Sequence, residues 1–287
     1  MRDHSQRDDV SGRSTTGHDW DGIQELDTPL PRWWLWVFIA CIIWAIGYWI
    51  LMPAWPLVSD HTRGLLGWSS RGRLAAEITQ ARAAQSGYVK RIEASDLATI
   101  EADPELLEFA LAGGRSAFGL HCAQCHGSGA EGAPGIANLN DDDWIWGGTL
   151  EAIHETIRVG VRSAHDETRF NEMPAFVADG ILSENEAVHV ADYVISLSNP
   201  GVKPDPQGAQ LFADNCTACH GEHGEGVREL GGPRLNDAIW LYGGTRDDVL
   251  RQIRKPRHGV MPTWEARLDP ATIKELAIYV HSLGGGE

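Results

Sequence analysis

Two short strings in this chain place two cysteines and a histidine at the same spacing. The first is LHCAQCHGSGAEG at 120–132, and the second is NCTACHGEHGEG at 215–226. A C-x-x-C turn sets two sulfurs at a separation that suits the vinyl groups of a porphyrin, and the histidine behind it reaches the iron from the same side. The strings therefore predict two covalently bound haem c groups. The residues that would hold them are Cys122, Cys125 and His126 for one and Cys216, Cys219 and His220 for the other.

Zinc binding and thiol redox chemistry are the other common uses of a C-x-x-C pair. A Cys₄ zinc site brings its second pair within about 15 to 20 residues, whereas Cys122 and Cys216 are 94 residues apart. A thioredoxin-type pair lies beside a βαβ pattern, and we find no strand pattern here. The fifth cysteine, Cys41, lies outside both strings, so the cysteines do not form the disulfide framework of a small secreted domain.

Two methionines stand at matching places after these strings. Met173 and Met261 follow the first cysteine of their string by 51 and 45 residues, and each is followed by proline. A thioether in that position predicts the sixth ligand of the haem iron. Ligation by histidine and methionine raises the reduction potential and closes the iron to small molecules, which indicates electron transfer and no catalytic residue at these haems.

Distal histidines are the alternative source of the sixth ligand. The candidates are His154, His165 and His189 in the first copy and His223, His258 and His281 in the second. The other interpretation of each is an ordinary surface histidine. His258 is the strongest candidate, because it lies three residues before Met261. A proximal histidine normally donates its other N–H to a backbone carbonyl. We predict Pro233 as the acceptor for His220 and Pro134 as the acceptor for His126.

Residues outside the two strings repeat in the same order. LNDDDWIWGG at 139–148 matches LNDAIWLYGG at 235–244, MPAF at 173–176 matches MPTW at 261–264, and VADYVISLS at 190–198 matches LAIYVHSLG at 276–284. The chain thus carries two tandem copies of one domain of roughly 90 residues, which we place at 105–199 and 200–287. Helical spacing, a capping box from Ser183 to Glu186 and the helix starts at Asp103-Pro104 and Asp269-Pro270 predict an all-α fold.

A single apolar stretch precedes the copies. The 20 residues WWLWVFIACIIWAIGYWILM from Trp33 to Met52 carry no charge, and at about 1.5 Å per residue they span roughly 30 Å, the thickness of the hydrocarbon core. Many polar residues come first and no small-x-small site follows, which disfavours a cleaved signal peptide. We predict a membrane anchor at 33–55, a helical connector at 56–104, and a polar tail at 1–32 that is disordered in isolation.

The charge balance disfavours nucleic acid as a partner. The formal net charge is -16, and phosphates reward clustered lysine and arginine. The first copy, 105–199, holds 15 acidic and 4 basic residues, whereas the second, 200–287, holds 12 and 10. We expect the acidic first copy to attract a cationic partner, although the same charge also serves solubility.

These features resemble a known family. The C-x-x-C-H strings, with glycine and phenylalanine upstream and Met-Pro downstream, resemble class I cytochrome c domains. The tail TTGHDWDGIQELDTPLPRWW, the single span, ADPELLEFALAGG and DDDWIWGGTLEAI together resemble the dihaem subunit III (CcoP or FixP family) of cbb3-type cytochrome c oxidases. The likeness covers nearly the whole chain, and the tail is its most specific part.

The resemblance implies a fold and a set of partners. In each domain the first and last helices would cross at a glycine, Gly114 with Tyr193 and Gly208 with Tyr279. The implied partners are a haem-copper catalytic subunit and a monohaem cytochrome c subunit of the oxidase, together with a donor cytochrome c or cytochrome bc1 complex. The chain would relay electrons toward oxygen reduction, which it cannot perform itself because it has no set of membrane histidines for haem b or copper.

The resemblance also implies a location. The anchor would cross the bacterial inner membrane once, with the haem domains in the periplasm and the N-terminus in the cytoplasm. Arg32 precedes the span and Arg63, Arg71 and Arg73 follow it, so a count of flanking positive charges favours the opposite orientation. Large domains translocate largely regardless of charge, and we therefore expect the haem domains on the periplasmic side.

Three other functions stay open at this point. A membrane-anchored dihaem cytochrome c could serve another respiratory complex or a dehydrogenase. A dihaem peroxidase would be an enzyme in its own right, but it needs an iron with a releasable position, which a methionine in both copies opposes. An assembly or scaffold subunit would carry the haems as secondary features.

Overall fold

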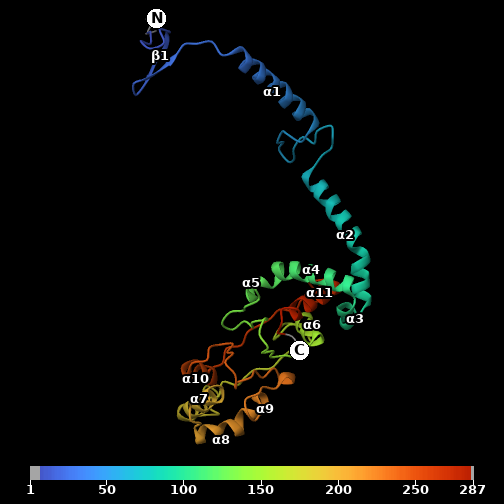
Figure 1. Ribbon diagram of the computed structural model, residues 1–287, viewed down its shortest axis with the longest axis vertical. Coiled ribbons are helices and arrows are strands. Elements are labelled where there is room, and N and C mark those ends of the chain that lie inside the picture. Colours follow the sequence, from blue (N-terminus) through green and yellow to red (C-terminus); the bar gives the residue numbers. More distant parts are fainter. Residues whose placement is uncertain (1–6, 286–287) are drawn as a thin grey trace. The chain divides into compact units, whose positions relative to one another are not determined.

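The structure is a computed structural model of the chain, and it describes residues 7–285 (Figure 1). It divides into two compact units, Met1–Ala84 and Gln85–Glu287. The elements in chain order are β1 (Thr15–Trp20), β2 (Ile23–Leu26), α1 (Arg32–Leu51), α2 (Ser70–Ala94), α3 (Leu97–Ala102), α4 (Pro104–His121), α5 (Ala123–His126), α6 (Leu150–Val159), α7 (Glu184–Ser198), α8 (Pro206–Asn215), α9 (Thr217–His220), η1 (Arg228–Leu230), α10 (Arg246–Arg254) and α11 (Pro270–His281).

The first unit contains the apolar span. Helix α1 covers 20 residues, none of which is buried against protein, and among the described residues it is the one helix long and apolar enough to cross a membrane. It begins one residue before the predicted span and ends one residue before its end, where Pro53 follows Met52 and lacks the N–H that a further helical turn needs.

The tail before α1 differs from the expectation of disorder. Strands β1 and β2 pair antiparallel, with Asp19 opposite Gln24 and Trp20 opposite Ile23. The turn between them places Gly22 at φ 87°, and the Gly22 N–H donates to Asp19 Oδ1 at 2.7 Å. Glycine enters this left-handed region without steric cost. The hairpin is the only sheet among residues 7–285, so the fold class is all-α as predicted.

In the second unit the helices begin where the sequence signals place them. Asp103 caps α4, and Pro104 is its first residue. Ser183 and Glu186 form the predicted capping box of α7. Asp269 accepts from the Thr272 N–H at 3.0 Å and caps α11. An oxygen side chain at the N-cap satisfies an N–H group that has no partner inside the helix.

These helices assemble into two lobes, each of which takes elements from both sequence copies. Lobe 1 consists of α3, α4, α5, α6 and α11, and lobe 2 consists of α7, α8, α9 and α10. Figure 1 shows α11, the red end of the chain, beside the green helix α4, and α7 beside α8 and α10. The last helix of each copy therefore packs in the other copy's lobe.

The predicted helix crossings are wrong for this reason. A Cβ added at Gly114 would overlap the carbonyl of Glu275 and the Cβ of Tyr279, not Tyr193. A Cβ added at Gly208 would overlap the carbonyl of His189 and the Cβ of Tyr193. Each crossing has the predicted composition, glycine against tyrosine, but the partners are exchanged between the copies.

The short linker explains the exchange. Helix α7 ends at Ser198 and α8 begins at Pro206, so the two are sequence neighbours, and short connections favour packing between neighbouring helices. Once α7 packs on α8, the glycine face of α4 is left for α11. Residues of the predicted connector also join lobe 1, where Ile92 and Ile100 are fully buried in the core with Phe118 and Leu276.

Candidate haem sites

Each C-x-x-C-H string folds as one short turn at the end of a helix. Cys122 follows the last residue of α4, and its N–H donates to the Phe118 carbonyl at 2.9 Å. The His126 N–H donates to the Cys122 carbonyl at 2.9 Å. In lobe 2 the matching bonds are Cys216 to Phe212 at 2.8 Å and His220 to Cys216 at 3.0 Å. This tight turn keeps the second cysteine and the histidine on one short helix behind the first cysteine.

The proximal histidines are fixed by backbone carbonyls. The Nδ1–H of His220 donates to the carbonyl of Pro233 at 2.9 Å, as predicted. The Nδ1–H of His126 donates to the carbonyl of Ala137 at 2.9 Å, so the prediction of Pro134 is wrong. Ala137 precedes Leu139 by two residues, as Pro233 precedes Leu235. Three more residues lie between Pro134 and Leu139 than between Pro233 and Leu235, so counting back from the leucine is the signal that finds the carbonyl.

Both imidazoles are suited to bind iron. Burial lowers the pKa of His126 and of His220, and the hydrogen bond to the backbone carbonyl opposes that shift. The neutral form is therefore favoured, and with Nδ1 donating to a carbonyl the lone pair lies on Nε2. A fixed tautomer and ring orientation of this kind is the usual support of a histidine ligand.

The first thiol of each string is protonated at neutral pH. Burial, and then the neighbouring Cys125, raises the pKa of Cys122 to about 11. Burial, and then Cys219, raises the pKa of Cys216 to about 12. A reactive or metal-binding cysteine needs a lowered pKa, so these environments oppose nucleophilic and thiolate–metal chemistry. They fit thiols that become thioethers on a porphyrin.

Met261 lies in lobe 1, although its position belongs to the second sequence copy. It packs against the lobe 1 core together with Cys122 and Trp144. Its backbone is held by the first copy, because Met261 N–H donates to the Val161 carbonyl and Val161 N–H to the Met261 carbonyl, both at 2.9 Å. Gly160 is required beside this bridge, since a Cβ there would overlap the Met261 carbonyl.

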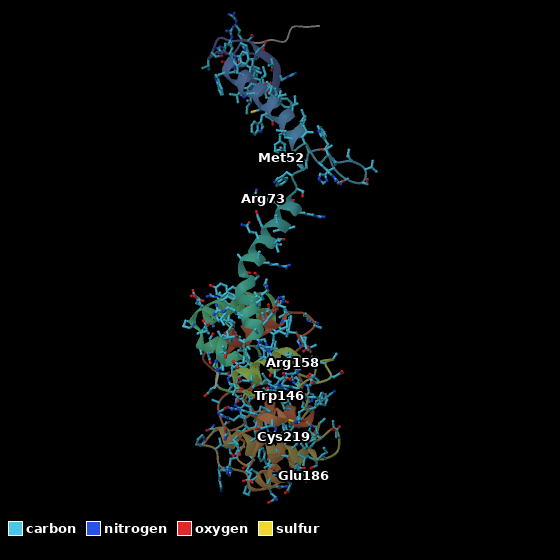
Figure 2. All side chains as sticks on the ribbon, turned by 90° about the vertical axis from the view of Figure 1, so that its right-hand side faces the viewer. Met52, Arg73, Trp146, Arg158, Glu186 and Cys219 are labelled. Atoms are coloured by element: carbon cyan, nitrogen blue, oxygen red, sulfur yellow. The ribbon has the colours of Figure 1, made fainter. Side chains whose placement is uncertain are left out.

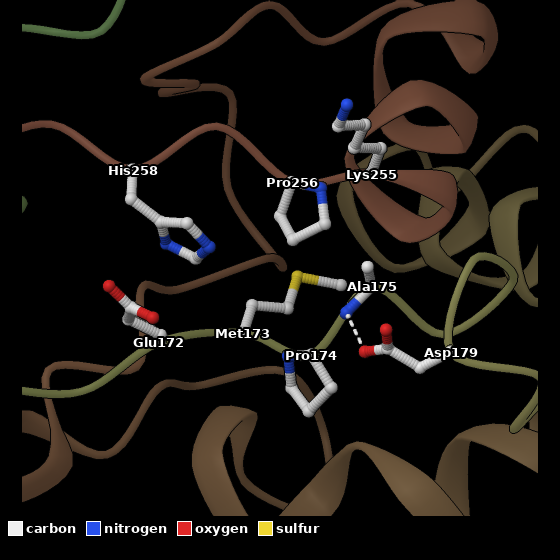
Figure 3. A pocket seen from close by; sticks show the side chains of 8 residues that line it. All are labelled: Glu172, Met173, Pro174, Ala175, Asp179, Lys255, Pro256 and His258. Atoms are coloured by element: carbon white, nitrogen blue, oxygen red, sulfur yellow. Dashed lines mark hydrogen bonds between the residues drawn. The ribbon is translucent and has the colours of Figure 1, made fainter.

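Met173 lies in lobe 2, although its position belongs to the first copy. It packs against the lobe 2 core, as Cys216 and Trp240 do. Figure 3 shows its sulfur directed into a hollow of about 420 Å³ that His258 lines from the facing segment. The chain after it is fixed by the Ala175 N–H, which donates to Asp179 at 3.0 Å. Each methionine therefore packs in the lobe that contains the C-x-x-C-H string of the other copy.

Most of the other candidate histidines have partners of their own. His165 Nε2 lies 2.6 Å from Glu265, His189 Nδ1 lies 3.0 Å from Asp205, and His281 lies 3.5 Å from Glu101. His258 is exposed, and it faces Met173, not the Met261 that follows it in sequence. His154 is half-buried on α6, and His223 is exposed.

Arg162 and Asn171 of the first copy make hydrogen bonds to backbone carbonyls of the second copy. The sequence predictions do not include these contacts. Arg162 Nε donates to the Gly259 carbonyl at 2.6 Å and Nη1 to the Asn171 carbonyl at 2.9 Å. Asn171 Nδ2 in turn donates to the Leu230 carbonyl at 2.6 Å. The signal in the sequence is a repeated Arg-x-x-x-Met-Pro string, in which Arg169 and Arg257 precede the two methionines by four residues.

Comparisons with family models agree with this architecture. Residues 12–59 match the N-terminal domain of cytochrome oxidase-cbb3, FixP. Residues 109–194 and 204–280 match subunit III of the cbb3-type cytochrome c oxidase. The two matched ranges of the second model correspond to the two sequence copies, and the first covers the hairpin and the apolar helix.

Curated relatives are similar over the whole chain. The cbb3-type cytochrome c oxidase subunit FixP of Bradyrhizobium diazoefficiens is 52% identical over 290 residues, which cover 100% of both chains. Subunit FixP of Azorhizobium caulinodans is 53% identical over 99% of this chain and 97% of its own. Subunit CcoP of Cereibacter sphaeroides is 50% identical over 95% of each.

Proposed function

Because the chain belongs to the family of cbb3-type cytochrome c oxidase subunits FixP and CcoP, we propose that it passes electrons through two haem c groups, one in each lobe. The family makes it a membrane-anchored cytochrome c subunit that transfers electrons within such an oxidase. The number of haems, their ligands, the partners and the side of the membrane are the parts that we propose.

We assign the ligands by lobe. In lobe 1 Cys122 and Cys125 would form the thioethers, with His126 and Met261 on the iron. In lobe 2 Cys216 and Cys219 would form them, with His220 and Met173 on the iron. When bound, haem c supplies a one-electron couple, and ligation by histidine and methionine gives it a raised potential. The residues present fit this group, because in each lobe the first cysteine of the string and one methionine pack against the same core.

The observation that carries the proposal is the pairing of histidine and methionine across the copies. His126 and His220 each donate a hydrogen bond from Nδ1 to a backbone carbonyl at 2.9 Å. Each lobe core contains one methionine together with one haem-binding cysteine. Since each lobe needs residues of both copies, neither copy alone completes a site. The two haems would therefore be loaded in one jointly folded unit, which suits a relay.

A spectroscopic label tests this pairing. Cys122→Ser leaves one vinyl group on the lobe 1 haem and red-shifts its absorption band, which distinguishes it from the lobe 2 haem. Combined with Met261→Ala, we expect carbon monoxide to shift the labelled band of the reduced protein, since the iron has lost its methionine. Combined with Met173→Ala, we expect it to shift the unlabelled band only.

The outcomes separate the alternatives. If Met173→Ala opens the labelled haem instead, the methionines pair within their own sequence copies and our assignment is wrong. If neither variant binds carbon monoxide, methionine is not the sixth ligand. Purification of the full chain in mild detergent, with its haem counted and its companions identified by mass, tests the number of haems and the membership of an oxidase complex.

For partners, we propose a haem-copper catalytic subunit and a monohaem cytochrome c subunit as neighbours. A donor cytochrome c or a cytochrome bc1 complex would supply the electrons. The 15 acidic and 4 basic residues of 105–199 support a basic donor, because opposite charges speed encounter. Oxidation of the donor by the intact oxidase is expected to slow as ionic strength rises from about 0.01 to 0.15 M, because the screening length of the charges shortens. An unchanged rate would contradict electrostatic docking.

For location, we propose that α1 crosses the bacterial inner membrane with the lobes on the periplasmic side. Support comes from the apolar helix and from the rule that large domains translocate largely regardless of their charge. Alkaline phosphatase, which is active only after export, tests this when it is fused behind Glu287. Activity of the fusion is expected, and an inactive but stable fusion would place the lobes in the cytoplasm.

A further inference from the structure

Arg169 is a half-buried cation with a buried nitrogen that lacks a partner. Its Nε is the one buried side-chain nitrogen or oxygen, among residues 7–285, that lacks a hydrogen-bond partner. Its Nη2 donates to the Ala152 carbonyl at 3.2 Å. Glu155 attracts it electrostatically, but that carboxylate is held by Arg158 at 2.8 and 2.9 Å. A buried polar atom is normally hydrogen-bonded, and the group that carries this one is a cation, so the free Nε indicates an anion.

Arg169 stacks on an aromatic ring that reaches the other lobe. Its guanidinium lies over the ring of Trp146 at 5.5 Å. The Trp146 ring reaches Gly231 of the loop before Pro233, where a Cβ would overlap the ring. Figure 2 shows Trp146 between Arg158 and Cys219 along the unit. Arg169 therefore stands in lobe 1 at the junction with lobe 2.

The backbone ties Arg169 to both methionine segments. Arg169 N–H donates to the Gly160 carbonyl at 3.1 Å, and Arg162 N–H donates to the Arg169 carbonyl at 2.9 Å. Val161 thus lies between Arg169 and Met261, forming a bridge with each. Met173 follows Arg169 by four residues. An anion bound here would be close to the proposed sixth ligand of lobe 1 and connected to that of lobe 2.

We propose that Arg169 binds a propionate carboxylate of the haem that Cys122 and Cys125 anchor, and this rests on the proposed function. A haem brings two carboxylates into its lobe, so the site itself would supply the anion. The planar guanidinium fork matches a carboxylate and stacks on an aromatic ring at the same time. Trp146 would then orient the fork, with Arg169 as the positioning charge of the lobe 1 haem.

Arg257, the aligned residue of the second copy, provides a matched control. It lies over Tyr242 at 4.7 Å, as Arg169 lies over Trp146. It is exposed. Its Nη2 donates to the Tyr242 carbonyl at 3.2 Å, and its Nε donates to Gln252 Oε1 at 3.4 Å. The same string thus gives an exposed arginine with hydrogen-bond partners in lobe 2 and a half-buried arginine with an unsatisfied Nε in lobe 1.

The test is the midpoint potential of each haem across pH 5 to 9, in Arg169→Gln, Arg169→Lys and Arg257→Gln, with Cys122→Ser as the label for lobe 1. Without the guanidinium, an unpaired propionate stabilises the ferric state, so the lobe 1 potential is expected to fall. A proton replaces the lost cation at low pH. The potential should therefore decline with rising pH by up to tenfold in the redox equilibrium per pH unit, about 59 mV for one electron.

Arg169→Lys keeps the charge and is expected to lie close to the wild type, and Arg257→Gln should leave both potentials unchanged. If Arg169→Gln retains two haems per chain with unchanged potentials and pH profile, the propionate contact is refuted while the proposed function stands. A wild-type chain without two haems would instead refute the proposed function.

Should Arg169→Gln fail to accumulate, resonance Raman spectra of Arg169→Lys decide the matter. The propionate bending mode responds to hydrogen bonding, so we expect it to shift in Arg169→Lys and to stay unchanged in Arg257→Lys. An unshifted mode in Arg169→Lys would overturn the proposal.

Discussion

Lobe 1 and lobe 2 place different ionisable side chains at the same point of the same helix crossing. In lobe 1 Glu275 lies against Gly113 and Gly114 and is 6% exposed. In lobe 2 the aligned residue is His189, which is half-buried and lies 3.0 Å from Asp205. The geometry of the crossing depends on glycine and tyrosine, which both lobes share, so the ionisable residue beside them is free to differ.

The two lobes should therefore lose stability at opposite ends of the pH range. Burial, and then the charge of Asp269, raises the pKa of Glu275 from 4.5 to about 7, so lobe 1 is favoured by acid. Hydrogen bonds from Gly208 and His189 lower the pKa of Asp205, and the stability that this carboxylate contributes is lost as pH falls through its folded pKa. One fold thus carries two different pH responses.

The largest expected effect comes from filling either crossing. Gly208→Ala should cost about 3 kcal/mol, because the added methyl meets backbone that cannot move aside, as it overlaps the His189 carbonyl. Hydrogen exchange should show lost protection in 184–198, whereas Gly114→Ala should expose 270–281. Gly119→Ala, with no atom within 4 Å of the added Cβ, is the control and should be slightly stabilising. If Gly208→Ala instead reduced hydrogen-exchange protection in 270–281, the result would contradict the exchange and support pairing within each copy.

A smaller effect is expected from Glu275→Gln. The carboxyl binds its proton more tightly in the folded than in the unfolded chain, so the free energy of unfolding of lobe 1 falls as pH rises from 4.5 to about 7. The shift corresponds to roughly 3 kcal/mol at most. Glu275→Gln should remove this fall and stabilise lobe 1 at pH 8, measured by hydrogen exchange at both ends of the range. Glu108→Gln, exposed on α4, is the control.

If lobe 1 of Glu275→Gln kept the wild-type dependence on pH, the burial of this carboxyl would not control the stability of the crossing. The contrast with His189 would then be one of composition only.

Lys274 connects lobe 1 to the end of α2, and lobe 2 has no matching contact among the described residues. Its ammonium donates to the carbonyls of Ile92, Glu93 and Ser95 at 3.0, 2.9 and 2.6 Å. Carbonyls at a helix C-terminus lack intrahelical partners. Lys274→Met should therefore cost about 2 kcal/mol and reduce hydrogen-exchange protection over 85–94. Lys203→Met in the linker should leave that protection unchanged, and equal protection in both variants would contradict the role of Lys274.

Local signals in the sequence predicted the local structure well. The capping residues Asp103, Ser183 and Asp269 act through hydrogen bonds to residues two or three positions away, so their spacing alone is sufficient. The carbonyl partner of His220 followed from the same reasoning. The partner of His126 did not, because three more residues lie between Pro134 and Leu139 than between Pro233 and Leu235, and the register had to be counted from Leu139.

The exchange of helices between the copies could not be read from the alignment. Both crossings contain glycine and tyrosine, so Gly114 fits Tyr193 and Tyr279 equally well as a pattern. The short linker 199–206 decides which tyrosine each glycine meets, because it keeps α7 beside α8. Linker length is not part of the repeated motifs. The N-terminal hairpin was missed because its polar composition hides a turn at Asp21 and Gly22, both at positive φ.

The smallest effect is expected for the ion pairs that join α10 to α7 on the surface of lobe 2. Arg254 Nε lies 2.7 Å from Glu184, with side chains 46% and 62% exposed. Exposed pairs gain little because water screens them and both side chains lose freedom. A double-mutant cycle of Arg254→Gln and Glu184→Gln should give a coupling free energy of about 0.5 kcal/mol or less, declining further in salt. A coupling above about 1 kcal/mol would mean that charge, and not the apolar core around Phe212 and Val190, joins the two copies in lobe 2.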